Sequence, residues 1–346
     1  MPGQLPLPWA PESPTPEEDA RLRAAYSALQ PHGVAMFGPS RVVLAPDAAP
    51  ALARCYNTPL HPDDTWVVTL PKSGEETGRG TTWTQELVWL LLNDCDFTGA
   101  RTMLMPDRWH FHDIQVITTA DTRAAVRAAP GTPSSRIFFE PIEARPRPWF
   151  VKTHLPLHMC PPRLIDTCKV IYVARNPKDM CVSFFHHQHL FRKAAPSLGM
   201  EEFVDLFIDG LTVSLPYFPH VLEAWKQRHH PNMLFLFFED LKKDLRGSII
   251  KVAEFLGKPT TEKQLDELEQ HLHFRNLKDN PWVNWEWLSS SVWSVGQNRK
   301  FMRKGQTGDW KNHFTRESDR KIETWMKKEL QNTDLTFVTD IPEGQQ

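Results

Sequence analysis

One short segment near the start of the chain constrains the fold more than any other. An apolar, β-branched run at 66–70 is typical of a buried strand, and an amphipathic stretch at 81–93 is typical of a helix. The turn after the strand contains Lys72, Ser73 and Gly74. The helix opens with Thr81 and Thr82. A strand, a Lys-Ser-Gly turn and a helix start together suit a phosphate, because backbone N–H groups and the helix dipole favour an anion there.

Apolar runs alternate with helical patterns along the rest of the chain. Strands are predicted at 149–152, 169–174 and 233–238, and helices at 177–190, 201–209, 219–228, 239–256, 261–272 and 317–330. Such alternation indicates an α/β fold with a central, mostly parallel sheet flanked by helices. Because no repeat or linker is apparent, we expect a single domain over residues 17–346, preceded by a flexible, proline-rich tail over residues 1–16.

Composition excludes several classes of partner. Forty basic residues against forty-two acidic residues give a formal charge of −2, which argues against nucleic acid or an anionic membrane as a bulk electrostatic partner. The five cysteines show no CxxC pairing, so we expect reduced thiols in a cytoplasmic protein, not a disulfide frame or a metal site. The longest apolar runs, 87–92 and 233–238, are too short to span a bilayer.

The turn after the first strand is P-loop-like without being a Walker loop. In a Walker loop, a second glycine stands after four intervening residues and is followed by Lys-Ser/Thr. Counted from Gly74, Arg79 occupies the position of that second glycine. The sequence therefore does not indicate a kinase or an NTPase.

A second block, Lys152-Thr153-His154, ends the strand predicted at 149–152. Side chains alternate along a strand, so the lysine and the histidine share one face. At the carboxyl edge of a parallel sheet that face looks into the ligand crevice, where a histidine serves as a general base near neutral pH.

A third block places Arg175 at the end of the strand predicted at 169–174, with Ser183 about two turns into the next helix. A guanidinium fork and a hydroxyl are suited to gripping a phosphate from two sides. On these residues alone, an arginine paired with a neighbouring carboxylate is an equally good interpretation.

A fourth block combines adjacent cations with glycines and a tryptophan: Arg303, Lys304, Gly305, Gly308 and Trp310. Glycine permits close backbone approach, so this pattern favours a loop wrapped around an anion over a merely solvated basic face.

From about Asp64 to Phe314 the four blocks closely resemble the cytosolic sulfotransferase family, with the last block the most specific. The resemblance implies 3'-phosphoadenosine 5'-phosphosulfate (PAPS) as the sulfuryl donor and no metal. It implies that the 5'-phosphosulfate is held by Lys72, Ser73, Gly74, Thr81 and Thr82. It implies that the 3'-phosphate is held by Arg175, Ser183, Arg303, Lys304 and Gly305. By the same resemblance, Trp83 and Phe274 stack on the adenine, His154 is the acceptor base, and Lys72 and Lys152 complete the catalytic set.

Three features depart from the family pattern. Phe238 stands where a tyrosine usually reaches the adenine, so the ring is kept and the hydroxyl lost. Arg316 and Arg320 alter the usual dimer motif, which makes that homodimer doubtful. Six residues, 75–80, separate the Lys-Ser-Gly turn from the helix start: they bulge outward, remodel the phosphate cradle, or come from an incorrect gene structure.

The sequence therefore predicts sulfuryl transfer from PAPS to a hydroxyl, or less readily an amine, of a small lipophilic acceptor such as a phenol, a steroid-like alcohol or a retinoid alcohol. The residues expected to line the acceptor pocket are Phe111, Trp149, Phe184, His187 and Trp293. Two alternatives stay open: a catalytically impaired nucleotide-binding homologue, and a variant that dehydrates an allylic alcohol as a retinol dehydratase of this family does.

Overall fold

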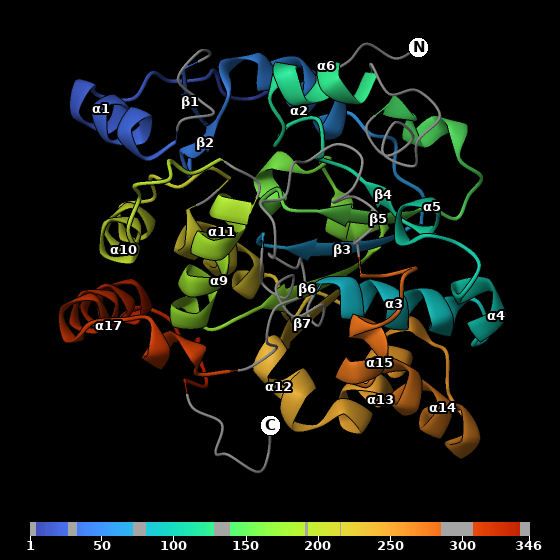
Figure 1. The fold of residues 1–346 in the computed structure, drawn as a ribbon. Helices are drawn as coiled ribbons and strands as arrows, with labels where there is room; N and C mark the ends of the chain where they lie inside the picture. The colour runs from blue at the N-terminus through green and yellow to red at the C-terminus, as the bar shows by residue number, and fades with distance from the viewer. Residues whose placement is uncertain are drawn as a thin grey trace.

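Five parallel strands form the centre of the protein (Figure 1). The computed structural model describes residues 5–26, 33–71, 81–127, 139–190, 193–214, 216–284 and 307–339. The strands lie in the order β4-β5-β3-β6-β7, and each neighbouring pair is parallel. Their bounds are β3 (Thr65–Thr69), β4 (His110–Phe111), β5 (Phe150–Thr153), β6 (Lys169–Ala174) and β7 (Met233–Phe237). The predicted α/β fold with a parallel sheet is confirmed.

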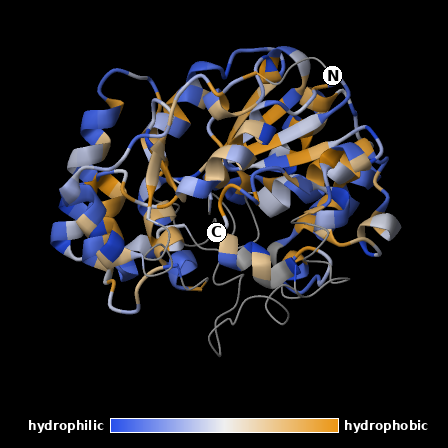
Figure 2. Ribbon diagram, turned by 90° about the horizontal axis from the view of Figure 1, so that it is seen from above, coloured by the Kyte–Doolittle hydropathy of each residue, from blue (hydrophilic) through white to orange (hydrophobic). Residues whose placement is uncertain are grey.

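Alternation along the strands divides the core into two apolar clusters, one on each face of the sheet. Trp66 and Val68 of β3 belong to one cluster, whereas Val67 belongs to the other. The first cluster is covered by α1 (Pro16–Ala25), α2 (Ala49–Tyr56), α9 (Pro177–Leu190), α10 (Met200–Ile208) and α11 (Tyr217–Lys226). The second is covered by α3 (Thr81–Leu92), α13 (Leu245–Leu256) and α14 (Glu262–Leu272). Figure 2 shows the result, with hydrophobic strands inside and mostly hydrophilic colouring on the outer helices.

The prediction of one continuous helix at 239–256 was wrong, because this segment forms two helices. α12 (Phe238–Lys243) ends before Asp244, whose carboxylate accepts a hydrogen bond from the backbone N–H of Gly247 at 2.8 Å and so caps α13. A Cβ at Gly247 would lie 2.2 Å from Asp244 Oδ2, so glycine makes room for this cap.

The other elements are short or lie at the periphery. A hairpin of β1 (Ala35–Phe37) and β2 (Val42–Leu44) was not predicted. α6 (Ala120–Arg127) precedes residues 128–138, which lie outside the described residues. The remaining helices are α4 (Phe97–Ala100), α5 (Met105–Arg108), α8 (Leu164–Thr167), α15 (Phe274–Lys278) and α17 (Arg316–Leu330). The 3-10 turns are η2 (Pro46–Ala48), η3 (Ile142–Ala144), η4 (Leu157–Met159) and η5 (Asp309–Asn312).

Two sequence expectations about the chain as a whole can be compared with the described residues. All five cysteines are free thiols, as predicted. Within the described ranges, none of the helices has the length and apolarity needed to cross a membrane. The tail boundary at residue 16 stays a prediction.

Candidate active site

The carboxyl ends of the strands bring several of the predicted site residues to one edge of the sheet. The register pairs Thr69 with Val173, and Phe111 with Lys152. His154, Arg175 and Phe238 each directly follow the last residue of their strand. Residues separated by more than a hundred positions in sequence are therefore neighbours at the edge where α/β proteins bind their ligands.

His154 is held by residues from strand β3, from the turn after β4 and from helix α11. Its Nδ1 lies 2.8 Å from the carbonyl oxygen of Thr69, and because a carbonyl only accepts, Nδ1 carries the proton. Its backbone N–H donates to Asp113 Oδ1 at 2.9 Å, and its carbonyl accepts from His220 Nε2 at 3.2 Å. The imidazole is thereby fixed in the tautomer whose Nε2 bears the lone pair that a general base uses.

Lys152 and His154 meet at one aromatic ring. Lys152 Nζ lies 4.3 Å from the ring centroid of Phe111, and the same ring meets the His154 imidazole edge-on at 5.3 Å. Both polar side chains are buried. The shared face predicted from strand alternation thus exists, and Phe111 forms its apolar wall.

The start of α3 contacts the end of β3. Thr81 Oγ1 lies 2.9 Å from Thr69 Oγ1, which ties the helix N-terminus to the strand that also holds His154. Trp83 is buried against the second cluster. The turn residues Lys72, Ser73 and Gly74, together with the six-residue segment 75–80, lie outside the described residues.

Arg175 is positioned through its backbone and its ring neighbour. Its guanidinium carbon lies 4.9 Å from the ring centroid of Phe238, and its carbonyl accepts a hydrogen bond from the Tyr217 hydroxyl. The next residue, Asn176, donates its N–H to Glu239 Oε1 at 2.9 Å. Burial raises the pKa of Glu239 to about 7, against the opposing effects of the Asn176 N–H and Arg175.

Among the buried hydroxyls that have no hydrogen-bond partner in the described residues, two belong to residues expected at the donor site. They are Thr82 Oγ1 at the start of α3 and Ser183 Oγ in α9. A buried hydroxyl without a partner is costly, and both belong to the sets expected to hold the donor nucleotide. The residues present therefore fit an anionic ligand whose oxygens would complete these two bonds.

One predicted pocket residue, Trp149, is not at this edge, and several other predicted residues lie outside the described part of the chain. Trp149 lies at the amino end of β5, where its indole N–H donates to the Arg145 carbonyl and its ring stacks under the Arg147 guanidinium. Phe184 is buried in the first cluster and stacks on His187 with centroids 5.8 Å apart. The side chain of Phe274 and the residues Trp293, Arg303, Lys304 and Gly305 lie outside the described residues.

Sequence reasoning missed three residues that hold His154: Thr69, Asp113 and His220. Each acts across the sheet or from another element, at 85, 41 and 66 positions from His154. The position of Thr69 at a strand end was a usable signal, whereas nothing in the sequence around Asp113 or His220 marked them.

Comparison with known proteins decides the family. The family model described as the sulfotransferase domain matches residues 62–334. The chain belongs to the sulfotransferase family. Sulfotransferase 1B1 of Canis lupus familiaris is 36% identical over 282 residues, which cover 81% of this chain and 88% of that relative. The amine sulfotransferase of Oryctolagus cuniculus is 32% identical over 284 residues, covering 82% of this chain and 85% of the relative.

Solved structures agree with the sequence relatives. The structure of retinol dehydratase in a complex with retinol and PAP superposes with a TM-score of 0.86 at 36% identity, covering 96% of this chain and all of that one. A second, retinol dehydratase with androsterone and PAP, gives 0.85 at 36% identity and covers 96% of this chain and 99% of the other. The protein is thus an enzyme, a sulfotransferase. The named sulfotransferases among its relatives favour this activity over the two alternatives raised from the sequence.

Proposed function

We propose that this sulfotransferase moves the sulfuryl group of PAPS to the hydroxyl, or less readily the amine, of a small lipophilic acceptor. The observation that carries the proposal is the His154 imidazole, fixed by Thr69 at the carboxyl edge and sharing the Phe111 ring with Lys152. An oriented imidazole and a buried ammonium on an apolar wall suit proton removal from an acceptor beside a developing negative charge.

The donor would lie between the start of α3 and the start of α9. Thr81, Thr82 and the helix dipole of α3 would hold the phosphosulfate together with Lys72, Ser73 and Gly74. Arg175, Ser183, Arg303, Lys304 and Gly305 would hold the 3'-phosphate, with Trp83 and Phe274 on the adenine. Phe238 would support Arg175 from beneath, since its ring is fully buried and lies against that guanidinium.

In the proposed reaction, the acceptor oxygen attacks the sulfur while His154 Nε2 takes the hydroxyl proton. A bond forms between the acceptor oxygen and sulfur, and the bond between sulfur and the oxygen of the 5'-phosphate breaks. Lys72 would neutralise the charge that develops on that leaving oxygen, and Lys152 the charge on the sulfuryl oxygens. The products are the sulfated acceptor and adenosine 3',5'-bisphosphate (PAP), and none of these steps calls for a metal.

The acceptor is proposed to be small and lipophilic because Phe111 presents an aromatic wall to His154. The structural neighbours bound to retinol or androsterone support this class, and the amine sulfotransferase relative supports testing an amine. Phe184, His187, Trp149 and Trp293 stay predictions as lining residues.

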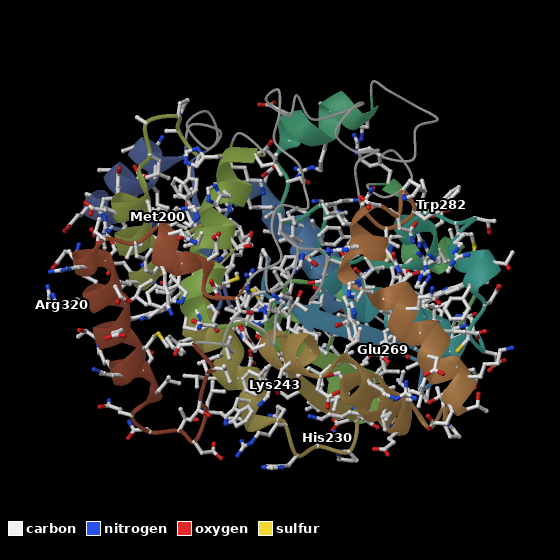
Figure 3. All side chains as sticks on the ribbon, turned by 60° about the horizontal axis from the view of Figure 1, so that its bottom comes forward. Met200, His230, Lys243, Glu269, Trp282 and Arg320 are labelled. Atoms are coloured by element: carbon white, nitrogen blue, oxygen red, sulfur yellow. The ribbon has the colours of Figure 1, made fainter. Side chains whose placement is uncertain are left out.

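Three further proposals concern the whole chain. Segment 75–80 interrupts the phosphosulfate loop. A dimer through the usual motif is weakened, because Arg316 and Arg320 replace the residues of that motif. Arg320 is exposed on α17 and pairs with Glu317 of its own helix at 2.7 Å (Figure 3). The protein is cytoplasmic, in line with its free thiols.

The direct test is incubation of the purified chain with PAPS and a panel of a phenol, a steroid alcohol, a retinoid alcohol and an arylalkyl amine. Mass spectrometry separates a sulfated product from a dehydrated one. We expect sulfation of at least one alcohol or phenol. Tight binding of PAPS without any product would overturn the proposal in favour of an impaired nucleotide-binding homologue, and dehydration alone would replace transfer by elimination.

A further inference from the structure

The turn of the β1–β2 hairpin lies against a histidine that the proposed sulfuryl transfer does not use. Ser40 Oγ in this turn lies 3.2 Å from Nε2 of His158, a residue of η4. On the other side of the ring, Nδ1 lies 3.0 Å from Oε2 of Glu223 on α11. A hydroxyl and a carboxylate that lie 118 and 65 positions from the histidine in sequence therefore contact its two ring nitrogens.

The carboxylate sets the tautomer of this histidine. Because a carboxylate only accepts hydrogen bonds, Nδ1 of His158 carries the proton that is donated to Glu223. Nε2 then bears the lone pair and accepts the hydroxyl proton of Ser40. A nucleophile bonded to a base, with the base oriented by a third group, is the arrangement that activates a serine.

The hairpin turn is shaped to approach the histidine closely. Gly38 has a φ of +68°, and a Cβ there would lie 3.1 Å from His158 Nε2 and 2.7 Å from Met159 Cε, so only glycine fits. Arg41 closes the turn by donating its N–H to the Gly38 carbonyl at 2.9 Å. Within the described residues, the backbone N–H of Ser40 donates no hydrogen bond, which leaves it able to stabilise an oxyanion formed at its own hydroxyl.

The surroundings leave room for a small ligand. Ser40, His158 and Glu223 are each half-buried, and a cavity of about 320 Å³ adjoins the last two. Tyr56 is one of the residues that line this cavity, and the ring of Trp9 meets the His158 ring edge-on with centroids 6.4 Å apart. A cavity at the small end of the range for ligand pockets, with aromatic neighbours, suits a small uncharged ester.

A neighbouring thiol is not a competing nucleophile. Cys160 lines the same cavity, but burial raises the pKa of its thiol well above its usual range. Since the thiolate is the reactive form of cysteine, this thiol is inert near neutral pH. The serine hydroxyl is therefore the nucleophile of the cluster.

We propose that Ser40 and His158 form a second catalytic site, which hydrolyses small carboxylic esters, with Glu223 as its positioning residue. Ser40 Oγ attacks the ester carbonyl carbon while His158 Nε2 takes the hydroxyl proton. The bond between that carbon and the alcohol oxygen breaks, and His158 returns the proton to the departing alcohol. Water then attacks the acyl-serine with the same base, which releases the carboxylic acid and restores the hydroxyl. None of these residues is expected to bind PAPS, so the inference does not rest on the proposed function.

The experiment treats the purified full-length chain with an alkyl fluorophosphonate in the absence of PAPS. Attack by Ser40 Oγ would form a phosphorus–oxygen bond and expel fluoride, and peptide mass spectrometry locates the modified residue. We expect modification of Ser40 in the unmodified chain. An unlabelled Ser40 would overturn the proposal, and this result does not depend on whether any variant folds.

Variants test the role of each partner through the labelling rate and through hydrolysis of p-nitrophenyl acetate. We expect His158→Gln to lower both rates by about 10²–10⁴-fold, as for loss of a general base. Glu223→Gln should lower them at least about tenfold, because an amide can donate to Nδ1 and move the proton to Nε2. The matched control is Ser197→Ala, which removes a serine from another exposed turn and should keep both rates.

A purely structural cluster gives a different pattern. If His158→Gln and Glu223→Gln lower the melting temperature while Ser40 is labelled at the rate of the unmodified chain, the three residues only tie the hairpin to η4 and α11, and the proposal is wrong. Hydrolysis of p-nitrophenyl acetate that is unchanged in Ser40→Ala would also overturn it, because the activity would then come from other residues.

Discussion

The imidazole Nδ1 of His154 lies 2.8 Å from the carbonyl oxygen of Thr69, the last residue of strand β3. The hydroxyl of the same threonine lies 2.9 Å from Thr81, the first residue of α3. One residue thus joins the proposed acceptor base to the helix whose N-terminus is proposed to hold the phosphosulfate. These two contacts fix the orientation of the imidazole relative to the start of α3.

Replacing His154 should abolish turnover and spare nucleotide binding. In His154→Ala we expect sulfuryl transfer to a phenol to fall by about 10²–10⁴-fold, the usual loss for a general base, with PAP affinity nearly unchanged. The matched control is His158→Ala, four residues on, because His158 contacts Ser40 and Glu223 and not this edge. Near-normal turnover in His154→Ala would remove the histidine from the mechanism.

Replacing Arg175 should weaken binding selectively. We expect Arg175→Ala to cost about 2–4 kcal/mol in PAP affinity, by analogy with truncating one partner of a buried charge pair, and far less for adenosine 5'-phosphate. Ser183→Ala should cost about 1 kcal/mol with the same selectivity, since it removes one neutral hydrogen bond. Calorimetry with both ligands measures this, and equal losses for the two nucleotides would show that Arg175 is structural.

The sequence predicted the sheet and the ends of its strands because strand alternation and strand-end polar residues are local signals. Lys152 and His154 share a face as period two requires, and Arg175 lies at the same edge. Nearness to Lys152 in sequence misplaces Trp149, because the length of β5 lies between Trp149 and His154. Trp149 therefore lies at the opposite edge of the sheet with Arg147.

Contacts that cross the fold left no such signal. Asp113 and Asp179 each accept backbone N–H groups from distant segments, and a buried carboxylate of this kind looks in sequence like any other acidic residue. The break at Asp244 was missed because apolar periodicity continues across it, while the cap depends on the glycine three residues later.

Acid should destabilise the protein through His220. Burial lowers its pKa to about 4 from an ordinary value of 6.5, and its ring is committed as a neutral tautomer between the Tyr172 hydroxyl and the His154 carbonyl. The unfolded chain therefore binds more protons than the folded one between pH 6.5 and 4. The free energy of unfolding should fall as pH drops through that window, by at most about 1.4 kcal/mol per pH unit for this group.

Other buried groups contribute with defined signs. Burial also lowers the pKa of His112 to about 4, so His112 adds to the loss of unfolding free energy in acid. Burial raises the pKa of Glu239 to about 7, so its contribution makes the free energy of unfolding fall as pH rises from about 4.5 to 7. Urea unfolding of the wild type and of His220→Gln at several pH values isolates the His220 contribution. The variant should show a shallower slope below pH 6.5, and parallel curves would exclude His220 as a source of the pH dependence.

Deleting residues 75–80 should raise activity or create it. The deletion joins the Lys72-Ser73-Gly74 turn directly to Thr81, whose hydroxyl is already tied to the end of β3. The backbone N–H groups, the lysine and the dipole of α3 would then converge on one anion. With the segment present, that convergence requires ordering extra residues at about 1–2 kcal/mol each, and Glu75 and Glu76 repel a phosphosulfate unless they face solvent.

The deletion separates catalysis from stability. A longer surface loop costs little free energy of folding, so the melting temperatures of the two forms should be similar while PAPS affinity and turnover differ. Exchanging Glu75 and Glu76 for glutamine in the full-length chain provides the control for charge alone. If this control recovers the activity of the deletion, repulsion is the cause; if only the deletion does, the cause is the geometry of the loop. Equal turnover in the deletion and the unmodified chain would mean that the segment bulges away from the nucleotide and leaves the phosphate cradle intact.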